Sequence, residues 1–120
     1  LSAAFCDKVY GDSFDVEGDL VYNIGNNVTL VFEDMDFGPE GAKAVSIVGR
    51  SRLDRNTIHI HFIDEGGTDK VQVVEYVGAK EFAEQTFGLE EIQGKCRVEF
   101  VFLPGSEFDF ASLQFLRDFK

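Results

Sequence analysis

Three acidic side chains, Glu33, Asp34 and Asp36, lie within four positions of one another and are the first candidates for chemistry. Glycosidases act through two carboxyl groups about 5 to 10 Å apart, so a pair from this cluster has the right chemical type. The chain holds 22 Asp and Glu residues, however, and acidic residues favour strand ends and turns. We therefore interpret the cluster as a solvated turn and expect no catalytic residues in this chain.

Two histidines, His59 and His61, stand two positions apart in a stretch with strand character. Side chains repeat every two residues along a strand, so both would share one face, as two ligands of a metal site do. No third ligand is evident. Because the apolar residues Ile58, Ile60 and Phe62 should face the core, we expect the histidines to point outward.

Basic residues concentrate in the segment GRSRLDR, which contains Arg50, Arg52 and Arg55. Guanidinium groups at one loop could hold a carboxylate or a sugar hydroxyl. They could equally form ion pairs with Asp54 and the acidic strands, or contact a neighbouring domain. Both interpretations stay open.

The elements that would position these groups are strands. Apolar and polar residues alternate over short runs, and Gly, Asn, Asp or Pro clusters separate the runs at intervals of about ten residues. This pattern predicts an all-β sandwich of about eight strands in two antiparallel sheets. The expected core faces are Val28, Leu30 and Phe32; Ile58, Ile60 and Phe62; Val71 and Val73; and Val98, Phe100 and Phe102.

One hairpin is clear from the turn residues. Glu65 to Asp69 reads EGGTD, which tolerates positive φ, so the segments 57–63 and 70–77 should pair across it. The segment 79–85 could form one helical turn.

Length and charge limit the possible partners. A chain of 120 residues suits one domain, and we expect a single domain over residues 1–120. The net charge of −11 disfavours nucleic acid and anionic membranes, and no apolar run is long enough to span a bilayer.

Cys6 and Cys96 are expected to be free and partly buried. The chain opens without Met or a leader, so we expect a piece of a longer protein.

Two stretches resemble family 6 carbohydrate-binding modules: residues 23–38, NIGNNVTLVFEDMDFG, and residues 96–115, CRVEFVFLPGSEFDFASLQF. The middle stretch, residues 45–62 (VSIVGRSRLDRNTIHIHF), is similar to a non-catalytic domain near the C-terminus of bacterial family 2 β-galactosidases. The resemblance implies a galactose-binding-like jelly roll of two antiparallel sheets. It also implies that the parent protein is a glycoside hydrolase.

The resemblance also implies a sugar site. Family members hold a sugar between two loop aromatics, which correspond to Ile24 and the neighbourhood of Phe82, with Tyr76 close by. The family's ligand-binding Asn corresponds to Asp109. The expected carbohydrate-binding residues are therefore Asn26, Asn27, Tyr76, Phe82 and Asp109.

A structural Ca²⁺ is the cofactor that the family implies. Asp12 lies near the place of its first ligand, but the Asp of the last strand motif is replaced by Ala111, which cannot ligate. The site is therefore left unassigned.

The function implied is that of a non-catalytic module of a bacterial β-galactosidase-type hydrolase, with carbohydrate and the parent's catalytic domains as partners. It would bind or position glycan weakly, galactose-containing glycans among them. The alternative is a structural sandwich that docks in the same hydrolase and binds no sugar.

Overall fold

The computed structural model describes residues 1–118, and strands make up most of them. The elements in order are a short 3₁₀ helix, η1 (Ala3–Phe5), and the strands β1 (Lys8–Tyr10), β2 (Ser13–Glu17), β3 (Leu20–Asn26), β4 (Val28–Asp36), β5 (Ala42–Asp64), β6 (Asp69–Ile92), β7 (Lys95–Phe102) and β8 (Phe108–Leu116). The prediction of an all-β chain with about eight strands is confirmed. No helix in the described part of the chain could cross a membrane.

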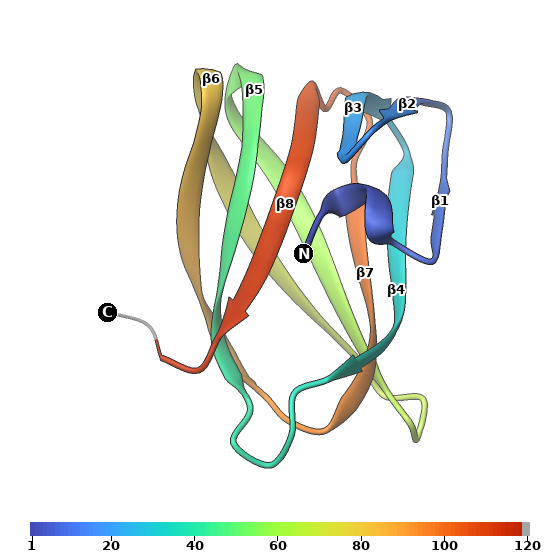
Figure 1. Ribbon diagram of the computed structural model, residues 1–120, viewed down its shortest axis with the longest axis vertical. Helices are drawn as coiled ribbons and strands as arrows, with labels where there is room; N and C mark the ends of the chain where they lie inside the picture. The colour runs from blue at the N-terminus through green and yellow to red at the C-terminus, as the bar shows by residue number, and fades with distance from the viewer. Residues whose placement is uncertain (119–120) are drawn as a thin grey trace.

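The strands form two antiparallel layers that share β5 and β6. Strand order is β1-β4-β7-β5-β8-β3-β2, with β6 paired to β5. The second half of β5 pairs with β7, whereas its first half pairs with β8. One layer therefore contains β1, β4 and β7, the other contains β2, β3 and β8, and the long β5–β6 hairpin crosses from one layer to the other (Figure 1).

The hairpin folds over at one end of the molecule, at the top of Figure 1. The β5–β6 register shifts between Ser51 and Arg55, where the two strands bend together. Gly78 sits inside this bend, and a Cβ atom there would overlap the carbonyl oxygen of Leu53. Glycine is therefore required by the close approach of the two strands. We call this end of the sandwich the rim.

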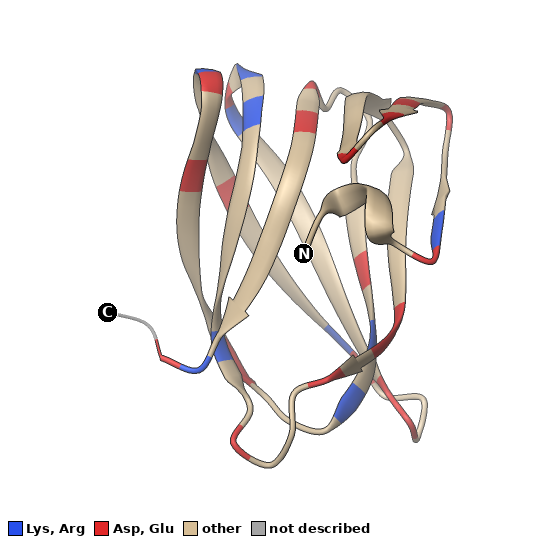
Figure 2. Ribbon diagram, viewed as in Figure 1, with Lys and Arg blue, Asp and Glu red and all other residues tan. Residues whose placement is uncertain are grey.

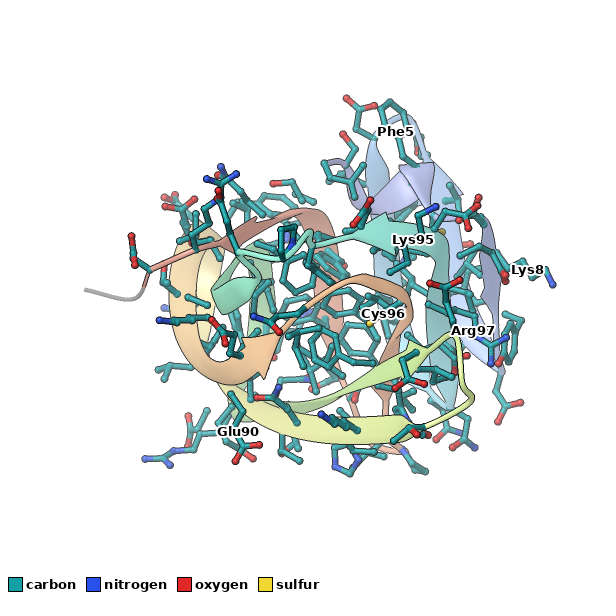
Figure 3. All side chains as sticks on the ribbon, turned by 90° about the horizontal axis from the view of Figure 1, so that it is seen from below. Phe5, Lys8, Glu90, Lys95, Cys96 and Arg97 are labelled. Atoms are coloured by element: carbon teal, nitrogen blue, oxygen red, sulfur yellow. The ribbon has the colours of Figure 1, made fainter. Side chains whose placement is uncertain are left out.

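The core lies between the two layers and is rich in aromatic rings (Figure 3). Phe100 packs edge-on against Phe110 with ring centroids 5.5 Å apart and against Phe32 at 5.9 Å. Such edge-to-face pairs add to the stabilisation that comes from burying the rings. The expected inward faces of β4, β7 and the second half of β5 are confirmed as buried: Val28, Leu30, Phe32, Ile58, Ile60, Phe62, Val98, Phe100 and Phe102.

The expected core face of β6 is wrong. Val71 and Val73 are 47% and 54% exposed, whereas Val74 and Tyr76 are buried. The expected inward residues are one position away from the residues that are buried, and a shift of one residue exchanges the two faces of a strand. The hairpin itself is confirmed, since His61 pairs with Val71 across the 65–68 turn.

The helical turn expected at residues 79–85 is also wrong. These residues belong to β6, where Ala83 pairs with Gly49 and Gln85 with Ile47 of β5. Pairing along the long β5 strand overrides a local helical preference.

The outer edge of β6 is closed by two glutamine side chains. Gln85 accepts a hydrogen bond from the backbone N–H of Val77 at 2.9 Å and donates one to the carbonyl oxygen of the same residue at 2.7 Å. Gln72 makes the same pair of bonds with the backbone of Glu90, at 2.8 and 3.1 Å. The two halves of β6 are thereby joined, so the edges of both layers are covered where they meet. We call these contacts the glutamine bridges.

The histidines and the acidic cluster that were candidates for chemistry make contacts that stabilise the fold. His59 and His61 lie on the outer face, as expected, and His61 Nδ1 is 2.9 Å from Asp69 Oδ2. Asp36 Oδ1 accepts a hydrogen bond from the N–H of Gly38 at 2.9 Å, which fits the turn interpretation. Cys6 is half-buried and Cys96 is buried, and both are free thiols.

Candidate functional site

An open pocket of about 650 Å³ lies at the rim, where the hairpin folds over. It is lined by four segments: residues 23–25 of β3, 50–54 of β5, 78–80 of β6, and 106–109 at the start of β8. Both layers therefore contribute to it, and most of its wall comes from strand ends and bends. Pockets in binding proteins commonly occupy such a place, because side chains there are free of core packing.

Asp109 links two sides of the pocket. Its Oδ2 accepts a hydrogen bond from Nε of Arg50 at 2.6 Å, and its Oδ1 accepts one from the backbone N–H of Asn23 at 2.8 Å. The β3–β8 register is irregular between Val21 and Ile24, and Asn23 has a φ of 53° there. This irregularity frees the N–H of Asn23 from the strand ladder, so that it can bond to the carboxylate.

Arg50 connects Asp109 with Phe82. Its guanidinium carbon lies 4.5 Å from the centroid of the Phe82 ring, so it covers one face of that ring. Phe82 is 38% exposed and is not part of the pocket wall, whereas Arg50 is. A guanidinium over an aromatic face is held there by cation–π attraction. The ion pair with Asp109 also fixes the orientation of the guanidinium on the ring.

A buried amide supports the pocket from below. Asn56 is fully buried, and its Oδ1 accepts a hydrogen bond from the backbone N–H of Glu107 at 3.0 Å. The same oxygen accepts a weaker bond from Ser51 Oγ at 3.4 Å. Asn56 thereby ties the bend of β5 to the segment that leads into β8. The two walls are held in register by a group that never reaches solvent.

One of the five expected binding residues lines this pocket, and a second contacts a residue of its wall. Asp109 lines it, and Phe82 reaches it through Arg50. Asn26 and Asn27 do not line it, because both side-chain amides donate to Oδ2 of Asp12, at 3.2 and 3.1 Å. Their amides therefore hold the chain before β2 rather than the pocket wall.

The expectation that Tyr76 contacts a ligand is wrong. Tyr76 has no exposed surface, and its hydroxyl lies 2.6 Å from the carbonyl oxygen of Gly49 and 2.5 Å from that of Ala83. Burial raises the pKa of this hydroxyl. Tyr76 therefore joins β5 to β6 inside the hairpin.

Ile24, which corresponds to the loop aromatic of the resemblance, is also fully buried. It packs in the core and offers no surface for a sugar ring to stack on. The pocket therefore has no free pair of aromatic platforms.

The residues present do not fit the Ca²⁺ site that the resemblance implies. Ala111 supplies no side-chain oxygen, and Asp12 Oδ2 is already shared by two amide donors. Within residues 1–118, no three His, Cys, Asp or Glu side chains gather as metal ligands would.

Sequence reasoning did not place Lys80, Glu107 or Asn23 at the site, although all three line the pocket. The concentration of positive charge in GRSRLDR does point to the site, because Arg50 and Arg52 line the pocket. Lys80 gave no signal, because its position depends on how β6 folds over with β5.

Comparisons with solved structures identify the architecture. A family 6 carbohydrate-binding module from Clostridium stercorarium, solved with cellobiose, matches with a TM-score of 0.81, 17% identity, and coverage of 98% of this chain and 92% of that one. A family 6 module from Clostridium cellulolyticum, solved with xylose, matches with a TM-score of 0.76, 19% identity, and coverage of 95% and 93%. The fold is the jelly roll of family 6 modules, as expected.

A similar domain also occurs as part of a larger enzyme. An arabinoxylan arabinofuranohydrolase of glycoside hydrolase family 43 from Bacillus subtilis, solved with cellotetraose, matches with a TM-score of 0.69 and 25% identity, over 82% of this chain and 21% of that one. No family model and no curated protein sequence matches the chain.

Proposed function

We propose that this chain is a non-catalytic carbohydrate-binding module that holds a glycan at the rim pocket. The observation that carries the proposal is an open pocket of about 650 Å³ at the rim of a family 6 jelly roll, with Asp109 and Arg50 in its wall. The solved modules of this fold named above were crystallised with cellobiose and xylose.

The chemistry of the wall suits sugar hydroxyls. Asp109 retains lone pairs beyond its two present bonds, and Arg50 retains N–H donors beyond Nε. Lys80 and Glu107 add a donor and an acceptor from two different segments of the pocket wall. Hydrogen bonds to sugars largely replace bonds to water, and no free aromatic pair adds stacking energy, so the affinity should be weak.

We further propose that the glycan contains galactose and that the parent protein is a β-galactosidase. Both proposals rest on the resemblance of residues 45–62 alone. Galacto-oligosaccharides therefore belong in the first ligand panel, beside cello-, xylo- and laminari-oligosaccharides.

The alternative function is docking against the catalytic domain of the parent hydrolase, without sugar binding. Two observations favour it: Ile24 is buried where the resemblance places an aromatic platform, and Arg50 covers one face of Phe82. Both reduce the stacking surface that neutral sugars use.

The test is a two-dimensional amide NMR titration with this ligand panel at millimolar concentrations, followed by calorimetry on any ligand that shifts resonances. The proposal expects shifts confined to residues 23–25, 50–54, 78–80 and 106–109. It also expects the Asp109→Ala variant to lose them and the Glu65→Ala variant to keep them, because Glu65 lies in the exposed turn at the other end of the hairpin. No shift with any glycan, neutral or acidic, would favour docking.

A further inference from the structure

Three basic side chains meet three carboxylates at the rim pocket of a chain that is acidic overall. The sequence has 11 Lys and Arg against 22 Asp and Glu, yet Arg50, Arg52 and Lys80 all line one pocket. Figure 2 shows blue segments together where β5 and β6 turn over. Arg50 and Arg52 come from β5, and Lys80 comes from the paired part of β6.

Arg50 is held in place, but most of its N–H donors have no acceptor in the described residues. Nε donates to Asp109 at 2.6 Å, and the guanidinium plane rests on Phe82. A guanidinium carries five N–H donors, and within residues 1–118 the others have no protein acceptor. The side chain is 45% exposed, so these donors are accessible from the pocket. A fixed planar fork of this kind matches a carboxylate or a sulfate, which can accept two parallel hydrogen bonds.

The other two cations are also free of partners. Arg52 and Lys80 are exposed, and neither forms an ion pair with any residue that the structure describes. The pocket wall also contains Asp54 and Glu107, and neither of these carboxylates pairs with the cations. Asp109 is compensated by Arg50 and by the N–H of Asn23.

Charges elsewhere on the chain act only weakly on a group in the rim pocket. At physiological ionic strength, screening reduces interactions between exposed charges beyond about 8 Å. Within this range the wall holds three cations, Arg50, Arg52 and Lys80, and three carboxylates, Asp54, Glu107 and Asp109. The attraction of an acidic group to the pocket therefore depends on the hydrogen bonds that the free N–H donors of Arg50 can make with it. A neutral sugar can accept hydrogen bonds from the same donors but lacks the added attraction between opposite charges, and Arg50 already covers one face of Phe82.

We propose that the rim pocket selects glycans that carry an acidic substituent, either the carboxylate of a uronic acid or a sulfate ester. This inference rests on the proposed function and names its ligand class. Arg50 binds the acidic group through its free donors, Asp109 and Phe82 position Arg50, and Arg52 and Lys80 supply attraction from the same wall.

The test compares ligands that differ only in charge. Tri-galacturonic acid is titrated against its methyl-esterified form, and galactose 6-sulfate against galactose, by NMR and calorimetry at low and physiological salt. We expect at least one acid to bind about ten-fold more tightly than its neutral counterpart, with a preference that weakens as salt rises. The two pairs distinguish a uronate from a sulfate.

Variants assign the preference to the pocket. Arg50→Gln should abolish it, and Arg50→Lys should retain only part of it, because an ammonium lacks the planar fork. Arg52→Gln and Lys80→Gln remove exposed charges that have no protein partner, so they should fold normally and weaken the preference. Lys43→Gln, in the second residue of β5 and outside the pocket wall, removes one charge and should leave the preference unchanged.

Equal binding of acidic and neutral ligands at the rim would overturn the inference and leave the proposed function intact. A preference that survives Arg50→Gln together with Lys80→Gln would also overturn it. Binding of no glycan in either panel would overturn the proposed function, and this inference with it.

Discussion

The hydroxyl of Tyr76 lies 2.6 Å from the carbonyl oxygen of Gly49, inside the bend that carries β5 and β6 from one layer to the other. Its ring packs edge-on against Phe108, with centroids 4.9 Å apart. One side chain thus connects β6, the interior of β5 and the first residue of β8. The rim depends on this contact, although Tyr76 never reaches the pocket surface.

Removing the Tyr76 hydroxyl should destabilise the fold without changing its shape. We expect Tyr76→Phe to lower the free energy of unfolding by about 1–3 kcal/mol, because the ring stays packed while buried carbonyl oxygens lose their donor. Urea denaturation followed by circular dichroism measures this. Tyr10→Phe is the matched control, since Tyr10 is 54% exposed and should be neutral. Equal stability of the two variants would contradict the assigned role.

The same residue predicts an alkaline transition. Burial raises the pKa of Tyr76 above its ordinary value of 10.0, so the folded state holds this proton more tightly than the unfolded state does. The stability that the neutral hydroxyl contributes is therefore complete below pH 10 and is lost as pH rises through the raised pKa. We expect the stability difference between wild type and Tyr76→Phe to shrink above about pH 10. A difference that stays constant to pH 11.5 would contradict this.

Gly78 should tolerate no side chain. We expect Gly78→Ala to destabilise the fold by roughly 3 kcal/mol, because the new methyl group would overlap the Leu53 carbonyl oxygen and force the bend apart. Gly66→Ala is the control, since the Cβ there meets only Asp64 Oδ1 at 3.4 Å. Thermal unfolding compares them. If both variants melt together, the close approach at the bend is not required.

The glutamine bridges should protect the edge of β6. In the Gln72→Ala, Gln85→Ala double variant we expect the amide protons of Val77 and Glu90 to exchange faster, because each loses its acceptor. Each bridge should contribute about 1 kcal/mol. Hydrogen exchange by NMR gives the rates, and light scattering reports whether the opened edge associates. Gln114→Ala, an exposed change on β8, should leave both unchanged.

Period-two patterning predicted most of the fold because most strands have one clearly apolar face. Ile58, Ile60 and Phe62 alternate with polar residues, so only one register buries them. In β6 the pattern is ambiguous, since Val71 and Val73 look more apolar than the true inward residues of that segment. Tyr76 is buried there because its hydroxyl finds backbone carbonyls, which no alternation rule reveals.

The wrong core face of β6 is an error of a single residue in register. The ligand role of Tyr76 came from the resemblance, which does not reveal that the side chain is buried. The site was predicted only in part for a different reason. Asp109 was found through a motif, whereas Lys80 reaches the pocket only because two long strands bend together. Such long-range placement leaves no local trace in the sequence.

The rim differs from most binding surfaces in that two of its segments, residues 50–54 and 78–80, lie in the middle of paired strands that continue into both layers. Between the pairs Gly49–Ala83 and Arg55–Val77 the ladder of β5 and β6 holds a single pair, Ser51–Ala79, so it is interrupted on both strands at the rim. Residues added to this unpaired stretch leave the pairs on either side in register. Proteins of this architecture can therefore change their preference for one glycan over another at the rim by the length of the bend as well as by exchange of individual side chains.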